Sequence, residues 1–152
     1  MAVMRQNKLI VTLIAISLGA LMYSCLPGNA GRQVANKTFQ FSLKGAILKA
    51  DEFQIFKRVL NKESHKEELV LVKTYKEAQP GFRLLSKGFK NAKDEGVIAK
   101  SIADRRIVFL SRGKNIFRIN YCTADGRMEG GPAIGGHPGM LFLPEYARKY
   151  VD

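Results

Sequence analysis

An uncharged, mostly apolar run from Leu9 to Leu26 is the first feature in the hydrophobic pattern of the chain. Arg5 and Lys8 precede the run, and Pro27 follows it. A short basic start before such a run is typical of an export signal. As a helix the run would be about 27 Å long, slightly shorter than a hydrocarbon core of about 30 Å. We therefore expect residues 1–30 to be a signal peptide, a lipoprotein signal or a membrane anchor.

Three fates of this segment stay open. A marginal membrane helix is the first. Cleavage before Gly31 is the second, because the small residues Gly28 and Ala30 occupy the positions three and one before that bond. The third is lipidation. The stretch Leu21 to Cys25 resembles the lipobox of bacterial lipoproteins, with Met22 and Tyr23 as departures from the usual pattern. That resemblance implies a lipid on Cys25.

Beyond residue 30, the next two patterned segments predict a strand and a helix. Residues 31–37 are small and polar and indicate a tether. From Phe39 the order Phe, Gln, Phe, Ser, Leu alternates apolar with polar residues, as in a half-buried strand. Asp51 then opens a stretch in which Phe53, Phe56 and Leu60 recur at spacings of three and four. This spacing predicts an amphipathic helix that continues to about Lys62.

The central part of the chain predicts strands. Leu69 to Val72 is a continuous apolar run that indicates a buried strand continuing to Tyr75. Two further runs, 106–110 and 116–122, flank the turn-forming residues 111–115 and predict an antiparallel hairpin. Residues 82–89 and 97–103 fit a strand or a short helix equally well.

Glycine and proline dominate residues 123–139, and this composition predicts a long loop. A final apolar run, Met140 to Leu143, favours a short strand that rejoins the sheet. Hydrophobic residues make up 46% of the chain and charged residues 25%, which is ordinary for a globular domain and excludes wholesale disorder. We therefore predict one domain over residues 31–152, of the α+β class, with an antiparallel sheet and one main amphipathic helix.

The charge of this domain is strongly basic. Of 25 Lys and Arg residues only Arg5 and Lys8 precede residue 31, and all 13 acids follow it, so residues 31–152 carry a net charge of +10. Such an excess predicts an anionic partner, either an anionic surface of the cell envelope or an acidic protein.

One group of side chains in the glycine-rich segment has the composition of a nucleophilic site. Cys122, Asp125, Glu129 and His137 lie within sixteen residues. An imidazole can accept a thiol proton, and a carboxylate can orient the ring. A thiol-dependent enzyme using Cys122 and His137 is therefore the alternative hypothesis. We favour a buried free thiol for Cys122, and the spacing predicts no metal site and no cofactor.

Basic and aromatic residues alternate in two stretches, 82–93 and 105–118. The candidate anion-binding residues in the second are Arg105, Arg106, Arg112, Lys114 and Arg118. Such a surface could bind single-stranded nucleic acid, but export argues against that partner. The leading hypothesis is a small exported or membrane-tethered protein, periplasmic or in the cell envelope if bacterial. It would bind or scaffold through a basic surface rather than catalyse.

Overall fold

The structure is a computed structural model that describes residues 28–96, 101–134 and 136–152. The predicted signal or anchor segment lies almost wholly outside these residues, as does the candidate lipidation site Cys25. Those predictions therefore stay predictions. Within the described ranges, no helix is both long enough and apolar enough to cross a membrane.

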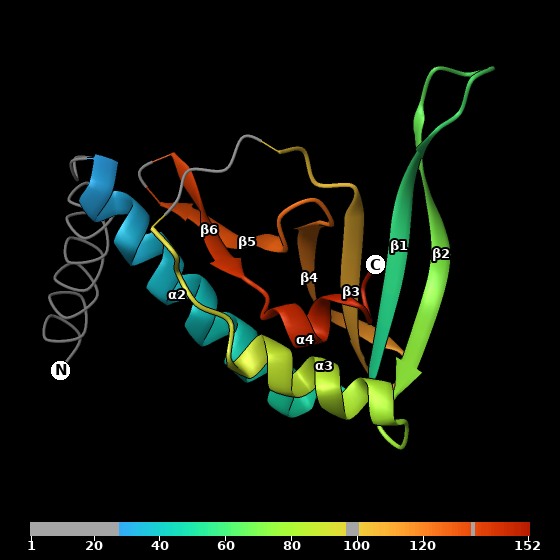
Figure 1. Cartoon of the computed structure of the whole chain (residues 1–152), viewed down its shortest axis with the longest axis horizontal. Coiled ribbons are helices and arrows are strands. Elements are labelled where there is room, and N and C mark those ends of the chain that lie inside the picture. The colour runs from blue at the N-terminus through green and yellow to red at the C-terminus, as the bar shows by residue number, and fades with distance from the viewer. Residues whose placement is uncertain (1–27, 97–100, 135) are drawn as a thin grey trace, which may run out of the picture.

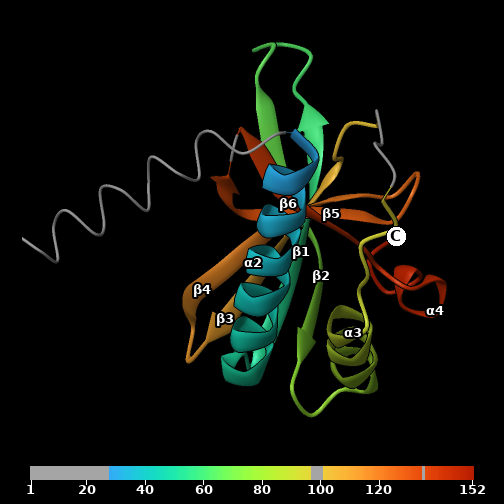
Figure 2. The same cartoon turned by 90° about the vertical axis from the view of Figure 1, so that its left-hand side faces the viewer.

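Helix α2, Gly28–Lys49, lies across one face of a sheet (Figures 1 and 2). The apolar side chains that it buries lie on one side at helical spacing: Ala35, Phe39, Leu43, Ala46 and Ile47, and Ala50 directly after the helix continues the pattern. The predicted tether over 31–37 and the predicted strand from Phe39 are therefore wrong. Alternation over 39–43 fits a strand only locally, whereas spacings of three and four continue for sixteen residues and place Phe39 and Leu43 on one side of a helix.

Two long strands follow α2: β1, Glu52–Leu60, and β2, Glu67–Lys76. The helix predicted over 51–62 is therefore wrong. Phe53 and Ile55 are buried two residues apart, which is the period of a strand, and Leu60 is exposed. Because β1 pairs with β2 on one side and β3 on the other, sheet pairing overrides the helical spacing.

The run Leu69 to Val72 is a strand, as predicted, and β2 extends past Tyr75. It is exposed rather than buried, because β2 is the outermost strand of the sheet. An edge strand has a neighbour on one side only, so an apolar run does not ensure burial there.

The sheet has six antiparallel strands in the order β2-β1-β3-β4-β5-β6. The remaining strands are β3, Arg105–Ser111, β4, Lys114–Cys122, β5, Arg127–Ile134, and β6, His137–Phe142. The predicted α+β fold on an antiparallel sheet is confirmed, and so are the β3–β4 hairpin and the final strand over the Met140 run.

The long loop predicted over 123–139 is wrong, because most of this segment forms β5 and β6. Gly130 of β5 pairs with Gly139 of β6 beneath α2. A Cβ atom on Gly139 would lie 2.2 Å from the Cβ atom of Phe39. Glycine is needed here because helix and sheet approach so closely, not because the chain turns.

Two shorter helices pack on the same side of the sheet as α2: α3, Pro80–Lys90, and α4, Glu145–Arg148. The ambiguous segment 82–89 is thus helical. Phe82 of α3 stacks on Phe53 of β1 with ring centroids 4.3 Å apart. At the start of α3, a Cβ atom on Gly81 would lie 2.4 Å from the ring of Tyr75. This close contact fixes α3 directly against the end of β2.

The contact between Phe39 and Gly139 gives a testable prediction for stability. Gly139→Ala should lower the free energy of unfolding by about 1 to 3 kcal/mol, because the added methyl group overpacks the interface between α2 and β6. Gly45→Ala is the matched control. No atom lies within 4 Å of its added Cβ, and alanine favours the helix, so stability should rise by about 0.5 to 1 kcal/mol. Urea unfolding of both variants checks the pair, and equal shifts of the same sign would contradict it.

Candidate functional site

The basic residues predicted to bind an anionic partner all lie on or beside the β3–β4 hairpin, but they do not form one cluster. Arg112 and Lys114 lie at the turn, and Arg106 lies near the start of β3. Arg112 is six residues after Arg106, so the Cα atoms of the two residues are roughly 20 Å apart along the extended chain. Arg118 is in the middle of β4. Arg105 forms an ion pair with Asp104, with the guanidinium nitrogen 2.7 Å from the carboxylate oxygen.

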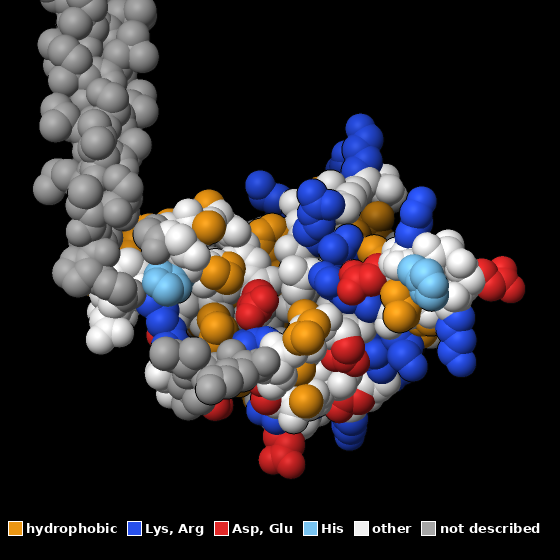
Figure 3. Space-filling view, turned by 90° about the horizontal axis from the view of Figure 1, so that it is seen from above, with side chains coloured by type: hydrophobic (Ala, Val, Ile, Leu, Met, Phe, Trp, Pro, Cys, Tyr) orange, Lys and Arg blue, Asp and Glu red, His pale blue; other side chains and the backbone are white. Residues whose placement is uncertain are grey.

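The aromatic residues that alternate with these basic residues pack toward the core. The rings of Phe109 and Phe117 are in edge contact, with centroids 5.6 Å apart. Phe82 and Phe89 both pack on Phe53. Rings that pack on one another in this way do not form an exposed stacking surface for bases. On the face shown in Figure 3, the Lys and Arg side chains are interspersed with acidic and apolar ones.

Cys122 is a buried free thiol at the end of β4, as predicted. Only 2% of its surface is exposed. The thiol forms a hydrogen bond with the nearby carboxylate of Asp125. Cys122 is therefore a buried thiol beside a partly buried polar group, and it is not an exposed nucleophile.

Asp125 accepts hydrogen bonds from three donors. They are the Arg127 backbone amide at 3.0 Å, the Ser101 hydroxyl at 2.9 Å and the Cys122 thiol. Burial raises the pKa of the Asp125 carboxyl, but these donors and the charge of Arg127 outweigh burial. The net pKa is below the ordinary value of 3.8, so the group is a stable carboxylate at neutral pH.

His137 lies far from Cys122. It is exposed at the first residue of β6, whereas Cys122 is next to Arg127, which pairs with Phe142 at the last residue of β6. Five residues of strand correspond to roughly 17 Å. The structure therefore does not bring the candidate thiol and imidazole together. Glu129 is also engaged elsewhere, in an ion pair with Arg127 at 3.3 Å.

Across the described residues there is no group of three or more His, Cys, Asp or Glu side chains that could hold a metal ion.

A groove between α2 and α3 is a further candidate site. Its volume is about 610 Å³. From α3 it is lined by Arg83, Lys87 and Lys90, which recur at spacings of four and three and therefore form one basic stripe along the helix. From α2 it is lined by the apolar residues Ile47 and Leu48. The opposite side of α3 packs into the core, so the hydrophobic effect itself holds the basic stripe toward the solvent.

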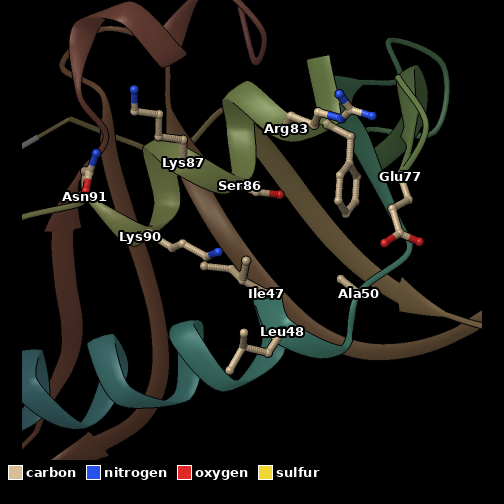
Figure 4. Close-up of a pocket in the computed structure, with 10 residues that line it drawn as sticks. Ile47, Leu48, Ala50, Glu77, Arg83, Ser86, Lys87, Lys90 and Asn91 are labelled. Carbon is tan, nitrogen blue, oxygen red and sulfur yellow. The ribbon is translucent and has the colours of Figure 1, made fainter. Parts of the chain in front are cut away.

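Two kinds of polar group in this groove have no partner among the described residues: the three cations and one hydroxyl. None of the three cations forms an ion pair with another described residue. The Ser86 Oγ atom, also in the lining, is buried and has no hydrogen-bond partner among the described residues. A buried polar atom without a partner is costly unless a ligand or water completes it. Figure 4 shows Lys90 reaching between α3 and α2 beside Ile47, while the carboxylate of Glu77 enters from the opposite end.

Two large apolar side chains of α2 are exposed, and one of them, Leu48, lines the groove. Phe41 and Leu48 are 81% and 79% exposed, and seven residues separate them, so they lie on the same side of the helix. Large apolar side chains that are exposed on one side of a helix are typical of protein contact surfaces.

The sequence contained a signal for this groove. The buried positions from Ala35 to Ala50 have helical spacing, and the same spacing places Phe41 and Leu48 outside. The signal is recognisable only in a window longer than the five-residue alternation at 39–43.

The burial of Cys122 gives a second prediction. In the folded protein, labelling of Cys122 by an alkylating reagent at neutral pH should be much slower than in urea, where the thiol is exposed. Mass spectrometry of the labelled chain checks this, and Cys25 should be replaced by alanine to leave one thiol. Equal labelling rates in both conditions would contradict the burial of Cys122.

A third prediction concerns Asp125. Because its pKa is lowered in the folded state, its contribution to stability is present above the unfolded pKa and is lost as pH falls through the folded pKa. Asp125→Asn should therefore lower the free energy of unfolding by about 1 to 2 kcal/mol at pH 7, through weaker hydrogen bonds. The difference from wild type should shrink in acid below the ordinary value of 3.8. Urea unfolding across this range checks the sign, and a difference that grows in acid would contradict it.

Comparison of the chain with protein-family models, with curated proteins and with solved structures found no match in any of the three.

Proposed function

We propose that this protein is an exported or membrane-tethered binding module of the cell envelope, and that the groove between α2 and α3 takes an acidic, partly apolar segment of a partner protein. One observation carries the proposal: Arg83, Lys87 and Lys90 line a groove whose other wall is apolar, and no described acid pairs with them. Unpaired cations beside exposed apolar surface are complementary to a segment that presents both carboxylates and apolar side chains.

The dimensions of the groove suit a short segment. From Arg83 to Lys90 the basic stripe rises about 10 Å along α3, or two turns of helix. The exposed side chains Phe41 and Leu48 extend the contact surface along α2. Such a combination of basic stripe, apolar wall and large exposed anchors fits an amphipathic helix laid in a groove.

Position along α2 favours a protein partner over a lipid surface. Leu48 lies twenty residues after Gly28, about 30 Å along the helix from the end that follows the predicted membrane segment. A groove at that separation is suited to a partner that stands off the membrane. The residues predicted from the sequence, Arg106, Arg112, Lys114 and Arg118, are spread over the β3–β4 hairpin and contribute general positive charge. A thiol-dependent enzyme using Cys122 and His137 has no support from the positions of those two side chains.

The fourth prediction tests the groove with a defined probe. A fluorescent peptide of about twelve residues, built from Glu and Leu at helical spacing, should bind the full chain in detergent, and salt should weaken the binding. The double variant Arg83→Glu with Lys90→Glu should weaken binding about tenfold or more, because both groove cations are reversed. Fluorescence anisotropy measures the affinity.

The matched control carries the same change of charge at the hairpin turn, in Arg112→Glu with Lys114→Glu. It should bind the peptide within about twofold of wild type, since that turn is not part of the groove. Equal losses in both double variants would mean that net charge alone attracts the peptide, and the proposal would fail. Binding to vesicles with anionic lipids but not to the peptide would redirect the proposal to lipid headgroups.

A further inference from the structure

The two edges of the sheet differ in how they are protected. Beside β6, Lys93 pairs with Phe142, and Pro138 removes one backbone donor from the strand. Beside β2, no described residue pairs with the outer side of the strand. An unpaired edge offers backbone N–H and C=O groups to any strand that can approach it.

The open edge is also apolar. Leu69, Val70, Leu71 and Val72 follow one another along β2 and are between 42% and 49% exposed. In Figure 1 the β1–β2 hairpin projects beyond the rest of the domain. The projecting edge is therefore accessible to another strand without interference from the helices.

We propose that a second copy of this chain pairs with this edge, with β2 antiparallel to β2 about a two-fold axis through Val70. The proposal goes beyond the binding function of the groove, whose lining contains no β2 residue.

The charges of β2 are symmetric about Val70. In the register with β1, Glu68 lies two residue pairs to one side of Val70, and Lys73 lies two residue pairs to the other side. The count is symmetric because Val72 forms a bulge and has no partner on β1. The β1 partners of Glu68, Val70 and Lys73 are residues 59, 57 and 55, which alternate along β1. The three side chains therefore share one face of the sheet. In a two-fold pair, Glu68 of each copy would lie beside Lys73 of the other. Opposite charges directly across two strands are stabilising.

The apolar residues on the opposite face have the same symmetry. Leu69 and Leu71 lie one pair on either side of Val70. In the same register, each Leu69 would face Leu71 of the other copy. A single register thus satisfies the charges on one face and buries leucines on the other, which is the self-complementarity that an isologous interface requires. An unrelated extended segment would need to reproduce this charge order by coincidence.

The fifth prediction uses the residue on the proposed axis. Val70→Cys, in a chain that also carries Cys25→Ala, should form a covalent dimer under mild oxidation of the full chain in detergent. Opposed residues on antiparallel strands have Cα atoms about 4.5 to 5.5 Å apart, within the range of a disulfide. Val59→Cys is the matched control, since Val59 is similarly exposed on the same face of β1. Its counterpart would be three strand spacings across and four residues along the strands, roughly 20 Å away, and should stay uncrosslinked.

A charge exchange tests the register without cysteines. Glu68→Lys alone and Lys73→Glu alone should each weaken the dimer about tenfold, because each places like charges side by side. The double exchange should restore association to within about threefold of wild type. Sedimentation equilibrium measures the constants. A monomeric wild type, equal crosslinking at Val59 and Val70, or a double exchange no better than the single variants would each overturn the proposal.

Discussion

The close approach of α2 to β5 and β6 is the constraint on which the rest of the fold depends. Phe39 lies against Gly130 and Gly139, where a side chain on the sheet would collide with the helix. Because glycine removes that obstacle, α2 can pack closely on β5 and β6 and cover this part of the core. The loss of side chains from β5 and β6 is offset by the aromatic ring of Phe39, which is completely buried.

The same arrangement determines where the groove forms. With α2 fixed at its Phe39 end, its last two turns extend toward the start of β1, and α3 packs beside them through Phe82 and Phe89. The core therefore fixes the buried side of α3, and the cations lie on the other side. No special loop is needed to position them. The groove is a consequence of two helices that share one sheet face but diverge at their solvent sides (Figure 4).

How far the sequence predicts this structure depends on the length of the window over which the helical and strand periodicities are compared. The β3–β4 hairpin was predictable because its alternation and its turn agree, and burial of Cys122 followed from its place at a strand end. Residues 39–43 and 51–62 were predicted wrongly because each short window fits both periods, and only partners distant in sequence decide between them. The glycines of 123–139 were taken for a loop, since nothing local shows that Phe39 requires them. The groove depends on α2 and was missed with it.

The contact between Gly81 and Tyr75 has a consequence for how the two surfaces communicate. The ring of Tyr75 at the end of β2 rests on the first turn of α3, and only residues 77–79 separate the two elements, so the edge strand and one wall of the groove are in direct contact. If the proposed partner orders α3, this contact is the route by which β2 would be ordered as well. Any coupling between the two binding events would be reciprocal, because thermodynamic linkage requires each to change the affinity of the other by the same factor. With positive coupling, a partner bound in the groove would strengthen the pairing of β2 between two copies of the chain.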